Sequence, residues 1–381
     1  MKYKLRNFVE AVSETEPSPQ NSQFDRFVGL EHYDSGEIEI TRYTDTSLLS
    51  SSVKIFRAND ILIARRNVYL KRAGIVFFDG LTSGDSIILR VLKDCERGTG
   101  VPYSDALRWL PLILNSSAFW AYANKHADGM NSKRISKEML LDYEFGAPSI
   151  ETIRSIADKV WSAHSLKKRY RKLLDLTDEM VKSRFIEEFN NPEIPKVSMS
   201  ELCTTFIDGD WIEAKDQSDS GYRLVQTGNV GVCEYVDKEE HARFVSEDTF
   251  KRLNCTEIHP GDILFSRLPD PIGRCCLIPR GFQKAITAVD CTITRLKDSC
   301  LPEYLMVYTT TNMYSEQIKT CVTGTTRQRI SRGNLAKIQV PLPSTERQQS
   351  FVDLVHQADK SKFELKQAIE KIDKVMRALL Q

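Results

Sequence analysis

Two segments of the chain repeat uncharged residues at a spacing typical of coiled-coil helices. In the first segment the steps are four, three, four and three residues, through Leu166, Tyr170, Leu173, Thr177 and Met180. The last segment has the same steps, through Leu365, Ile369, Ile372, Met376 and Leu379. The other faces are charged, so each helix has one narrow seam that needs a partner. We predict long helices over residues 149–191 and 344–381, with these residues in the coiled coil or in partner docking.

The rest of the chain predicts two globules of mixed structure, over residues 1–148 and 192–343. In the first globule GEIEITRY (36–43) alternates, and DILIAR (60–65), GIVFF (74–78) and DSIILRVL (85–92) are short apolar runs. Such patterns predict strands, and a segment around 104–125 that is rich in Leu, Trp and Ala predicts a helix. The second globule follows the same outline.

An internal repeat relates the two halves of the chain. GMNSKRISKEMLLDYEFGAPSIE (129–151) and GTTRQRISRGNLAKIQVPLPSTE (324–346) agree at eight of 23 positions without a gap, where chance would give about one or two. The sequence DIL recurs at 60–62 and 262–264, and we pair Gly74 with Gly273. The chain is therefore interpreted as one unit, a globule followed by a helix, written twice.

This duplication predicts the fold class. We expect an α+β protein with two similar domains, separated by two long helices that form an antiparallel coiled coil with pseudo-two-fold symmetry. The alternative is a pair of separate helical arms, each of which binds another protein.

Composition narrows the functional classes. The 53 basic and 52 acidic residues give a net charge of +1, whereas many nucleic-acid binders are far more basic, so any basic surface must be local. No run approaches the ~20 apolar residues of a membrane span, and the first residues do not resemble a signal peptide, so we expect a cytoplasmic protein. The nine cysteines lack a C-x-x-C pair and are expected to be free thiols without a metal.

Two similar globules at a fixed separation would suit a bipartite DNA site. Basic and amide side chains gather beside both repeated junctions and in loops that follow apolar strands. Arg can pair with guanine, Asn and Gln with adenine, and Lys and Arg with phosphates. The candidates for DNA contact are Arg65, Arg66, Lys71, Arg72, Asn131, Lys133, Arg134, Arg267, Arg274, Arg327, Gln328 and Arg329. The alternative is that these are solvated or structural charges.

The second junction, GTTRQRISRGNLAKIQVPLPSTERQ (324–348), resembles the specificity subunit of type I restriction–modification systems. KSRFIEEF (182–189), RLVQTGNVG (223–231) and PGDILFSRLPDPIGRC (260–275) resemble the same family. The resemblance covers essentially the whole chain. The first junction departs from it, with Lys133 in place of Gln328 and GAPS in place of a PLP-type turn.

The resemblance implies a function. Each domain would read one half of an asymmetric bipartite DNA sequence, and the coiled coil would set the gap between the halves. The chain would bind no cofactor of its own. It would recruit two methyltransferase subunits that use S-adenosylmethionine to methylate adenine N6, together with motor-nuclease restriction subunits in a complete system.

Two other classes were weighed against this function. An enzyme would need a cofactor loop, a phosphate loop or a catalytic cluster of histidines, and the sequence contains no such motif, so we expect a non-catalytic subunit. The remaining alternative is a non-catalytic protein-interaction scaffold that does not read DNA sequence.

Overall fold

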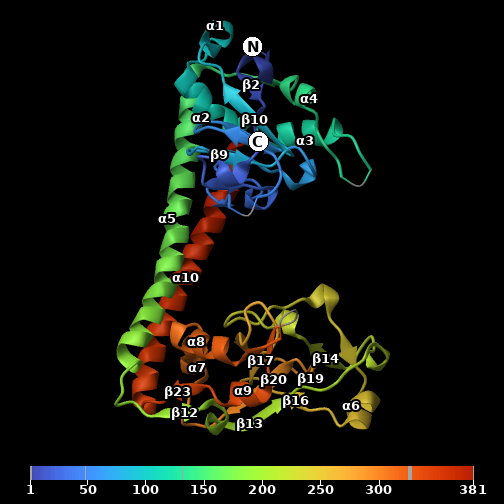
Figure 1. Cartoon of the computed structure of the whole chain (residues 1–381), viewed down its shortest axis with the longest axis vertical. Helices are drawn as coiled ribbons and strands as arrows, with labels where there is room; N and C mark the ends of the chain where they lie inside the picture. The colour runs from blue at the N-terminus through green and yellow to red at the C-terminus, as the bar shows by residue number, and fades with distance from the viewer. Residues whose placement is uncertain (1, 48, 131, 325–327, 381) are drawn as a thin grey trace. The chain divides into compact units, whose positions relative to one another are not determined.

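A computed structural model describes residues 2–47, 49–130, 132–324 and 328–380 (Figure 1). It divides the chain into two compact units. The first unit contains Met1–Tyr170 and Gln367–Gln381, and the second contains Arg171–Lys366. Each long helix therefore contributes residues to both units.

The first unit is built on three sheets. A four-stranded antiparallel sheet has the order β2 (Val9–Val12), β10 (Ser86–Val91), β7 (Ile61–Ala64) and β8 (Ala73–Ile75). A five-stranded sheet has the order β3 (Glu14–Glu16), β6 (Val53–Phe56), β9 (Gly80–Thr82), β4 (Arg26–Val28) and β5 (Thr44–Asp45), in which β4 and β9 are parallel. The short strands β1 (Lys2–Lys4) and β11 (Glu144–Gly146) form the third sheet.

The second unit repeats this topology. Its four-stranded antiparallel sheet has the order β13 (Cys203–Asp208), β20 (Cys291–Leu296), β17 (Ile263–Ser266) and β18 (Cys275–Leu277). A second sheet has the order β15 (Phe244–Val245), β14 (Tyr222–Val225), β19 (Ala285–Thr287) and β16 (Glu257–Ile258), and β14 and β19 are again the parallel pair. The strands β12 (Lys196–Ser198) and β23 (Gln339–Pro341) correspond to β1 and β11, and the antiparallel pair of β21 (Val322–Thr323) and β22 (Arg329–Ile330) corresponds to the bridge between Asp128 and Arg134 in the first unit. The matching strand orders confirm the predicted duplication.

Strand register corrects one predicted pair of equivalent residues. Gly74 lies opposite Leu62 in the first unit, and Cys276 lies opposite the equivalent Leu264 in the second. Cys276 is therefore the counterpart of Gly74, and the pairing of Gly74 with Gly273 was wrong. Gly273 lies earlier, in the turn, where a left-handed backbone (φ 78°) suits glycine.

The central strand β7, and β17 apart from Ser266, are apolar because both of their faces are buried. Ile61 and Ile63 point into one apolar cluster, and Leu62 and Ala64 point into another. In the second unit Ile263 and Phe265 share a cluster from which Leu264 is separate. Alternate residues of a strand point to opposite faces, so a strand between two cores cannot show an alternating polar pattern.

Helices cover one face of each four-stranded sheet. In the first unit these are α2 (Tyr103–Ile113) and α3 (Ser117–Lys125), which bury Trp109 and Phe119 beside Phe8. In the second unit they are α7 (Pro302–Thr309), which buries Tyr304 and Tyr308, and α8 (Asn312–Cys321), which buries Tyr314. Two short helices, α1 (Cys95–Thr99) and α6 (Glu247–Leu253), lie in the loops.

The long helices are α5 (Ile150–Phe189) and α10 (Thr345–Leu379). In the second unit the rings of Phe185 and Phe189 each lie 5.4 Å from that of Phe351, and Lys362 Nζ lies 2.8 Å from Asp178 Oδ1. The later α5 residues thus contact the earlier α10 residues, so the two helices run antiparallel here.

The same direction holds in the first unit. The side chains of Val160 and Met376 belong to one buried cluster, and Lys167 forms an ion pair with Asp373. The residue number again falls along α10 as it rises along α5.

The buried face of α5 differs from the predicted seam by one residue. Leu166, Leu173 and Met180 are 40%, 46% and 49% exposed, whereas Lys167 and Val181 are buried. The predicted seam is wrong at these three positions because the true seam contains His164 and Lys167, which an apolar pattern cannot identify. Tyr170 is half-buried.

The predicted seam of α10 lies on the inner side of that helix. Met376 is buried, and Ile372 and Leu379 pack beside it in the same cluster. Leu365 and Ile369 are half-buried.

All nine cysteines are free thiols. Among the residues described, there is no cluster of three or more side chains suited to a metal, and no helix is long and apolar enough to cross a membrane.

Candidate nucleic-acid interface

The residues shared by the two junctions hold the backbone in place. Ile135 and Ile330 are buried, as are Leu140 and Leu335. In each unit the isoleucine lies just before a short helix and the leucine lies within it. This helix is α4 (Lys137–Leu141) in the first unit and α9 (Arg332–Ala336) in the second. These identical residues of the two repeats therefore form an equivalent local core in each unit.

The shared serines begin these short helices. Ser136 Oγ accepts a hydrogen bond from Met139 N at 3.1 Å, and Ser331 Oγ accepts one from Asn334 N at 3.1 Å. Serine is a favoured N-cap because its side chain satisfies an amide that has no partner within the helix. The shared motif is thus a structural anchor, and recognition is left to its neighbours.

Each junction is attached to the loop that follows the central strand of its unit. Ile135 N donates to Arg65 O at 3.0 Å, and Ile330 N donates to Arg267 O at 3.1 Å. In both units these bonds join the two segments in which sequence reasoning placed DNA-contacting side chains. The structure therefore brings the two predicted segments together in each unit.

In the first unit the two segments are joined at several further points. Asn67 N donates to Lys133 O at 2.7 Å, and Arg66 Nε donates to Ser132 Oγ at 3.0 Å. Arg66 and Arg134 also form an isolated β-bridge. These contacts make residues 65–72 and the described part of 128–134 one continuous surface.

The basic side chains of this surface differ in their exposure and in whether they have an acidic partner. Lys71, Lys133 and Arg134 are exposed and have no acidic partner within the described ranges. Arg65 and Arg66 lie 3.9 Å and 3.4 Å from carboxylate oxygens of Asp85 and are 39% and 43% exposed. The first three are the more available to a polyanion.

Arg72 acts inside the loop. Its guanidinium donates to Leu30 O at 3.0 Å and to Arg66 O at 3.1 Å. Two of its five N–H groups are thus engaged by the fold, and Nε has no partner among the described residues.

The two loop arginines of the second unit are engaged more completely. Arg267 is 12% exposed at its side chain, donates to Val289 O at 2.5 Å and lies 3.5 Å from Asp208. Arg274 donates to four backbone carbonyls, those of Thr227, Val230, Leu268 and Pro271. Burial lowers the pKa of Arg274. Both side chains brace the loops, which matches the structural alternative considered for these charges.

Gln328 and Arg329 remain exposed beside the second junction. Arg329 belongs to β22, which pairs with β21. Two other predicted contact residues, Asn131 and Arg327, lie outside the described residues.

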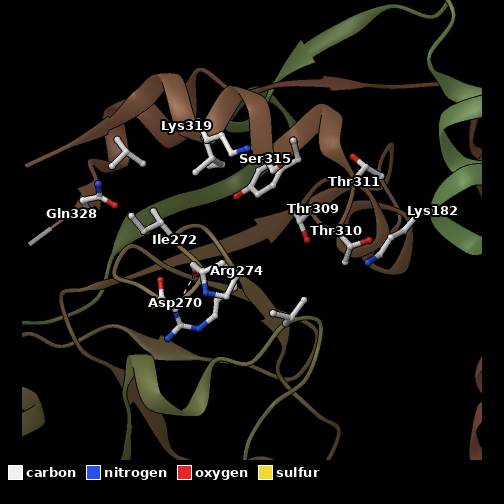
Figure 2. Close-up of a pocket in the computed structure, with 15 residues that line it drawn as sticks. Lys182, Asp270, Ile272, Arg274, Thr309, Thr310, Thr311, Ser315, Lys319 and Gln328 are labelled. Atoms are coloured by element: carbon white, nitrogen blue, oxygen red, sulfur yellow. Dashed lines mark hydrogen bonds between the residues drawn. The ribbon is translucent and has the colours of Figure 1, made fainter. Parts of the chain in front are cut away.

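A cavity of about 460 Å³ lies next to Gln328 in the second unit. In Figure 2, Ser315 and Lys319 project from α8 on one side, and Asp270 and Arg274 lie on the other. We call it the junction pocket. It places Gln328 and the loop that follows β17 on one concave surface.

Sequence reasoning missed a second group of cations in this unit. Arg223, Lys238, His241 and Arg243 line a separate cavity of about 340 Å³. Arg223 lies in β14 and the other three residues lie in the segment before β15, and both strands are distant in sequence from the two junctions. The RLVQTGNVG motif drew attention to Arg223, but nothing in the sequence showed that the later cations fold back against it.

Comparison with known proteins identifies a domain in the second half of the chain. Residues 193–374 match the model of the type I restriction modification DNA specificity domain. Comparison with curated protein sequences gives no significant match.

Several solved structures resemble the whole chain. One comes from a study titled as the structural basis of complex assembly and conformational transition of the type I R-M system. It aligns with a TM-score of 0.59 and 16% identity, over 100% of this chain and 96% of that chain, which shows a common fold. The HsdS subunit from Thermoanaerobacter tengcongensis aligns with a TM-score of 0.43 and 16% identity, over 100% of this chain and 95% of that chain. An S subunit of a type I restriction-modification system from M. genitalium aligns with a TM-score of 0.47 and 12% identity, over 100% of this chain and 94% of that chain.

The family model covers the second globule and most of the second long helix, and the first globule repeats the topology of the second. Residues 193–374 therefore match the DNA specificity domain of type I restriction–modification systems, and the whole chain shares the fold of a chain solved in a study of the type I R-M system.

Proposed function

We propose that this chain is the DNA-reading subunit of a type I restriction–modification complex, with one half of an asymmetric bipartite target read by each unit. One observation carries the proposal. Both units join the loop after their central strand to the segment before α4 or α9 by the same backbone hydrogen bond, yet the exposed side chains on that surface differ. A common scaffold with different exposed groups is suited to reading two different sequences.

The exposed groups have the chemistry for such reading. Gln328 can form paired hydrogen bonds with an adenine edge, and Arg329 can pair with guanine or contact a phosphate. In the first unit Lys133, Arg134 and Lys71 can neutralise phosphates or reach guanine. Arg72, Arg267 and Arg274 are assigned to bracing the loops, because each guanidinium already donates to a backbone carbonyl oxygen of its own unit.

The long helices are proposed to set the gap between half-sites and to recruit partners. The exposed Leu173 and Met180 lie on α5 seven residues apart, so they share a helix face that could pack against a methyltransferase subunit. That subunit would supply S-adenosylmethionine and the adenine pocket, and this chain would contribute no catalytic group. Motor-nuclease subunits would complete a restriction complex.

Selection of binding sites tests the proposal. The full chain, co-expressed with its methyltransferase subunits, is used to enrich duplexes from a random pool, and the Gln328→Ala variant is treated in the same way. We expect the variant to lose preference at one position of one half-site, because a paired amide contact discriminates by about 1–3 kcal/mol. Gln357→Ala, at an exposed position on α10, is the matched control.

The outcomes separate the alternatives. Loss of both half-sites together would contradict direct reading by Gln328. Binding without enrichment of any bipartite sequence, in the presence of the partner, would favour the protein-interaction scaffold.

A further inference from the structure

We propose that the second unit carries a phosphate pocket, formed by Arg223, Lys238, His241, Arg243 and the turn at 226–229, which binds a backbone phosphate of the DNA. The cavity measures about 340 Å³. The inference rests on the proposed function and adds to it a site outside both junctions. The shared chemistry is that of a phosphate oxyanion, in a phosphodiester or in a free phosphate.

The charge of the pocket is positive although the chain is almost neutral. None of the described residues that line it is acidic. Arg223 is paired with Asp237 at 2.5 Å, but Lys238 and Arg243 have no carboxylate partner in the described part of the chain. Cations grouped in a concavity concentrate the electrostatic field there, so an incoming anion is favoured over the surrounding surface.

The floor of the pocket is fixed before any ligand arrives. Asn229 is buried, accepts a hydrogen bond from Gln226 N at 3.0 Å and donates to Val236 O at 3.0 Å. Arg274 holds the turn from its other side by donating to Thr227 O and Val230 O. A preorganised turn reduces the ordering cost of binding.

The absence of a side chain at Gly228 shapes the cavity. A Cβ atom at this residue would lie 3.1 Å from Lys238 Nζ. Glycine therefore lets the ammonium group lie close over the turn, within the space that a phosphate would share.

The first unit provides an internal comparison. Thr82 Oγ1 donates to Val28 O at 2.7 Å, as Thr287 Oγ1 donates to Val225 O at 2.9 Å, so the strands before the two turns correspond. In the first turn Gly29 N donates to His32 Nδ1 at 2.9 Å, which matches the Gln226–Asn229 bond.

That correspondence places Glu31 where the second unit has Gly228. The Glu31 side chain is 68% exposed, and its carboxylate lies over the turn, where a Cβ on Gly29 would meet Oε1 at 2.3 Å. A carboxylate at this point would repel a phosphate. The equivalent described turn of the first unit is therefore unsuited to a phosphate.

The phosphate pocket is also close to the proposed reading surface. Arg274 lines the junction pocket beside Gln328, and the same guanidinium binds the turn of the phosphate pocket. A duplex that contacts Gln328 would thus have backbone phosphates within this region. Phosphate contacts fix orientation without carrying sequence information.

Binding of the full chain to labelled duplexes at several KCl concentrations tests the pocket. The Lys238→Gln/Arg243→Gln variant should weaken binding to all sequences alike and lower the slope of log affinity against log salt by about 1. Gly228→Glu, which copies the first unit, should have the same effect. The matched control is Lys196→Gln/Arg280→Gln, which removes two exposed cations of the same unit outside the pocket and should leave the slope unchanged.

Inorganic phosphate distinguishes the two sources of the anion. It should compete with the duplex for the wild-type chain and compete less for the pocket variants. A pocket variant that matches the control in duplex binding would overturn the proposal, and it would do so even if phosphate binding were lost, because the ligand would then be a free phosphate. A random duplex suffices for these slopes, so the result does not depend on whether a bipartite sequence is ever enriched.

Discussion

At the scale of single residues, each unit contains an equivalent ion pair between a buried aspartate and a partly exposed arginine. Arg90 binds both carboxylate oxygens of Asp60 at 2.8 Å and 2.7 Å, and Arg295 binds Asp262 at the same distances. Each aspartate also accepts a hydrogen bond from the backbone three residues earlier. The repeated DIL sequence indicated equivalent strands, but the partner arginine, about 30 residues away, could be assigned only from the sheet order.

Removal of the Asp60 carboxylate should show how much the ion pair contributes to stability. Asp60→Asn should reduce the free energy of unfolding by roughly 2–3 kcal/mol, less than for a fully buried pair because Arg90 is 36% exposed. Asp34→Asn, at the exposed pair with Arg42, is the matched control and should have little effect. Urea denaturation of both variants gives the comparison, and equal effects would contradict the role assigned to Asp60.

The candidate site, too, could be predicted from the sequence only in part. Basic side chains beside the junctions could be found from the sequence because they stand next to a repeated motif. The sequence could not show which of these side chains face solvent and which brace a loop. Arg274 and Arg134 are both arginines in loops, and they differ only in the residues that surround them.

At the scale of elements, the central feature is a buried polar group in the helix contact of the first unit. Lys167 Nζ donates to Glu37 at 2.6 Å and also pairs with Asp373 of α10. The heptad spacing predicted both long helices, since charged faces and a narrow seam require that form. It misplaced the α5 seam because this lysine occupies a seam position.

Lys167→Met should destabilise the first unit by about 3 kcal/mol, because it leaves two carboxylates near each other without their shared cation. Lys168→Met removes a neighbouring ammonium that is 47% exposed and should have a smaller effect. Hydrogen exchange at the end of α10 measures the change locally. Faster exchange in both variants alike would argue against a special role for the buried lysine.

Glu39 makes the same region sensitive to acid. Burial alone would raise its pKa, but hydrogen bonds from His164 and Lys168 outweigh burial and leave the pKa of Glu39 lowered. A carboxylate with a lowered pKa stabilises the folded state above its ordinary pKa of 4.5, and that contribution is lost as the pH falls through the lowered value.

The difference in unfolding free energy between the wild type and Glu39→Gln should therefore shrink as the pH is lowered below 4.5. Urea denaturation over a series of pH values measures it. A difference that stayed constant with pH would show that the carboxylate is not the titrating group.

At the scale of the whole molecule, the duplication was visible in the sequence and the topology was not. Identities at the junctions mark the buried anchors of α4 and α9, which two diverged copies must keep. The order of strands in each sheet depends on contacts between segments far apart in the chain, and short runs such as those of β15 and β16 carry too little pattern to place them.

We propose that the paired helices keep the two reading units at a set distance. One heptad can be inserted between Tyr170 and Arg171 and another between Lys366 and Gln367, where the chain passes from one unit to the other. Seven residues preserve the seam and lengthen a helix by about 10 Å, close to three base pairs of DNA.

Selection of binding sites with this variant and its methyltransferase subunits is the most direct measurement. We predict that both half-sites keep their sequences and that the unspecified gap grows by about three base pairs. A gap of unchanged length, or one uninterrupted target in place of two half-sites, would contradict the account.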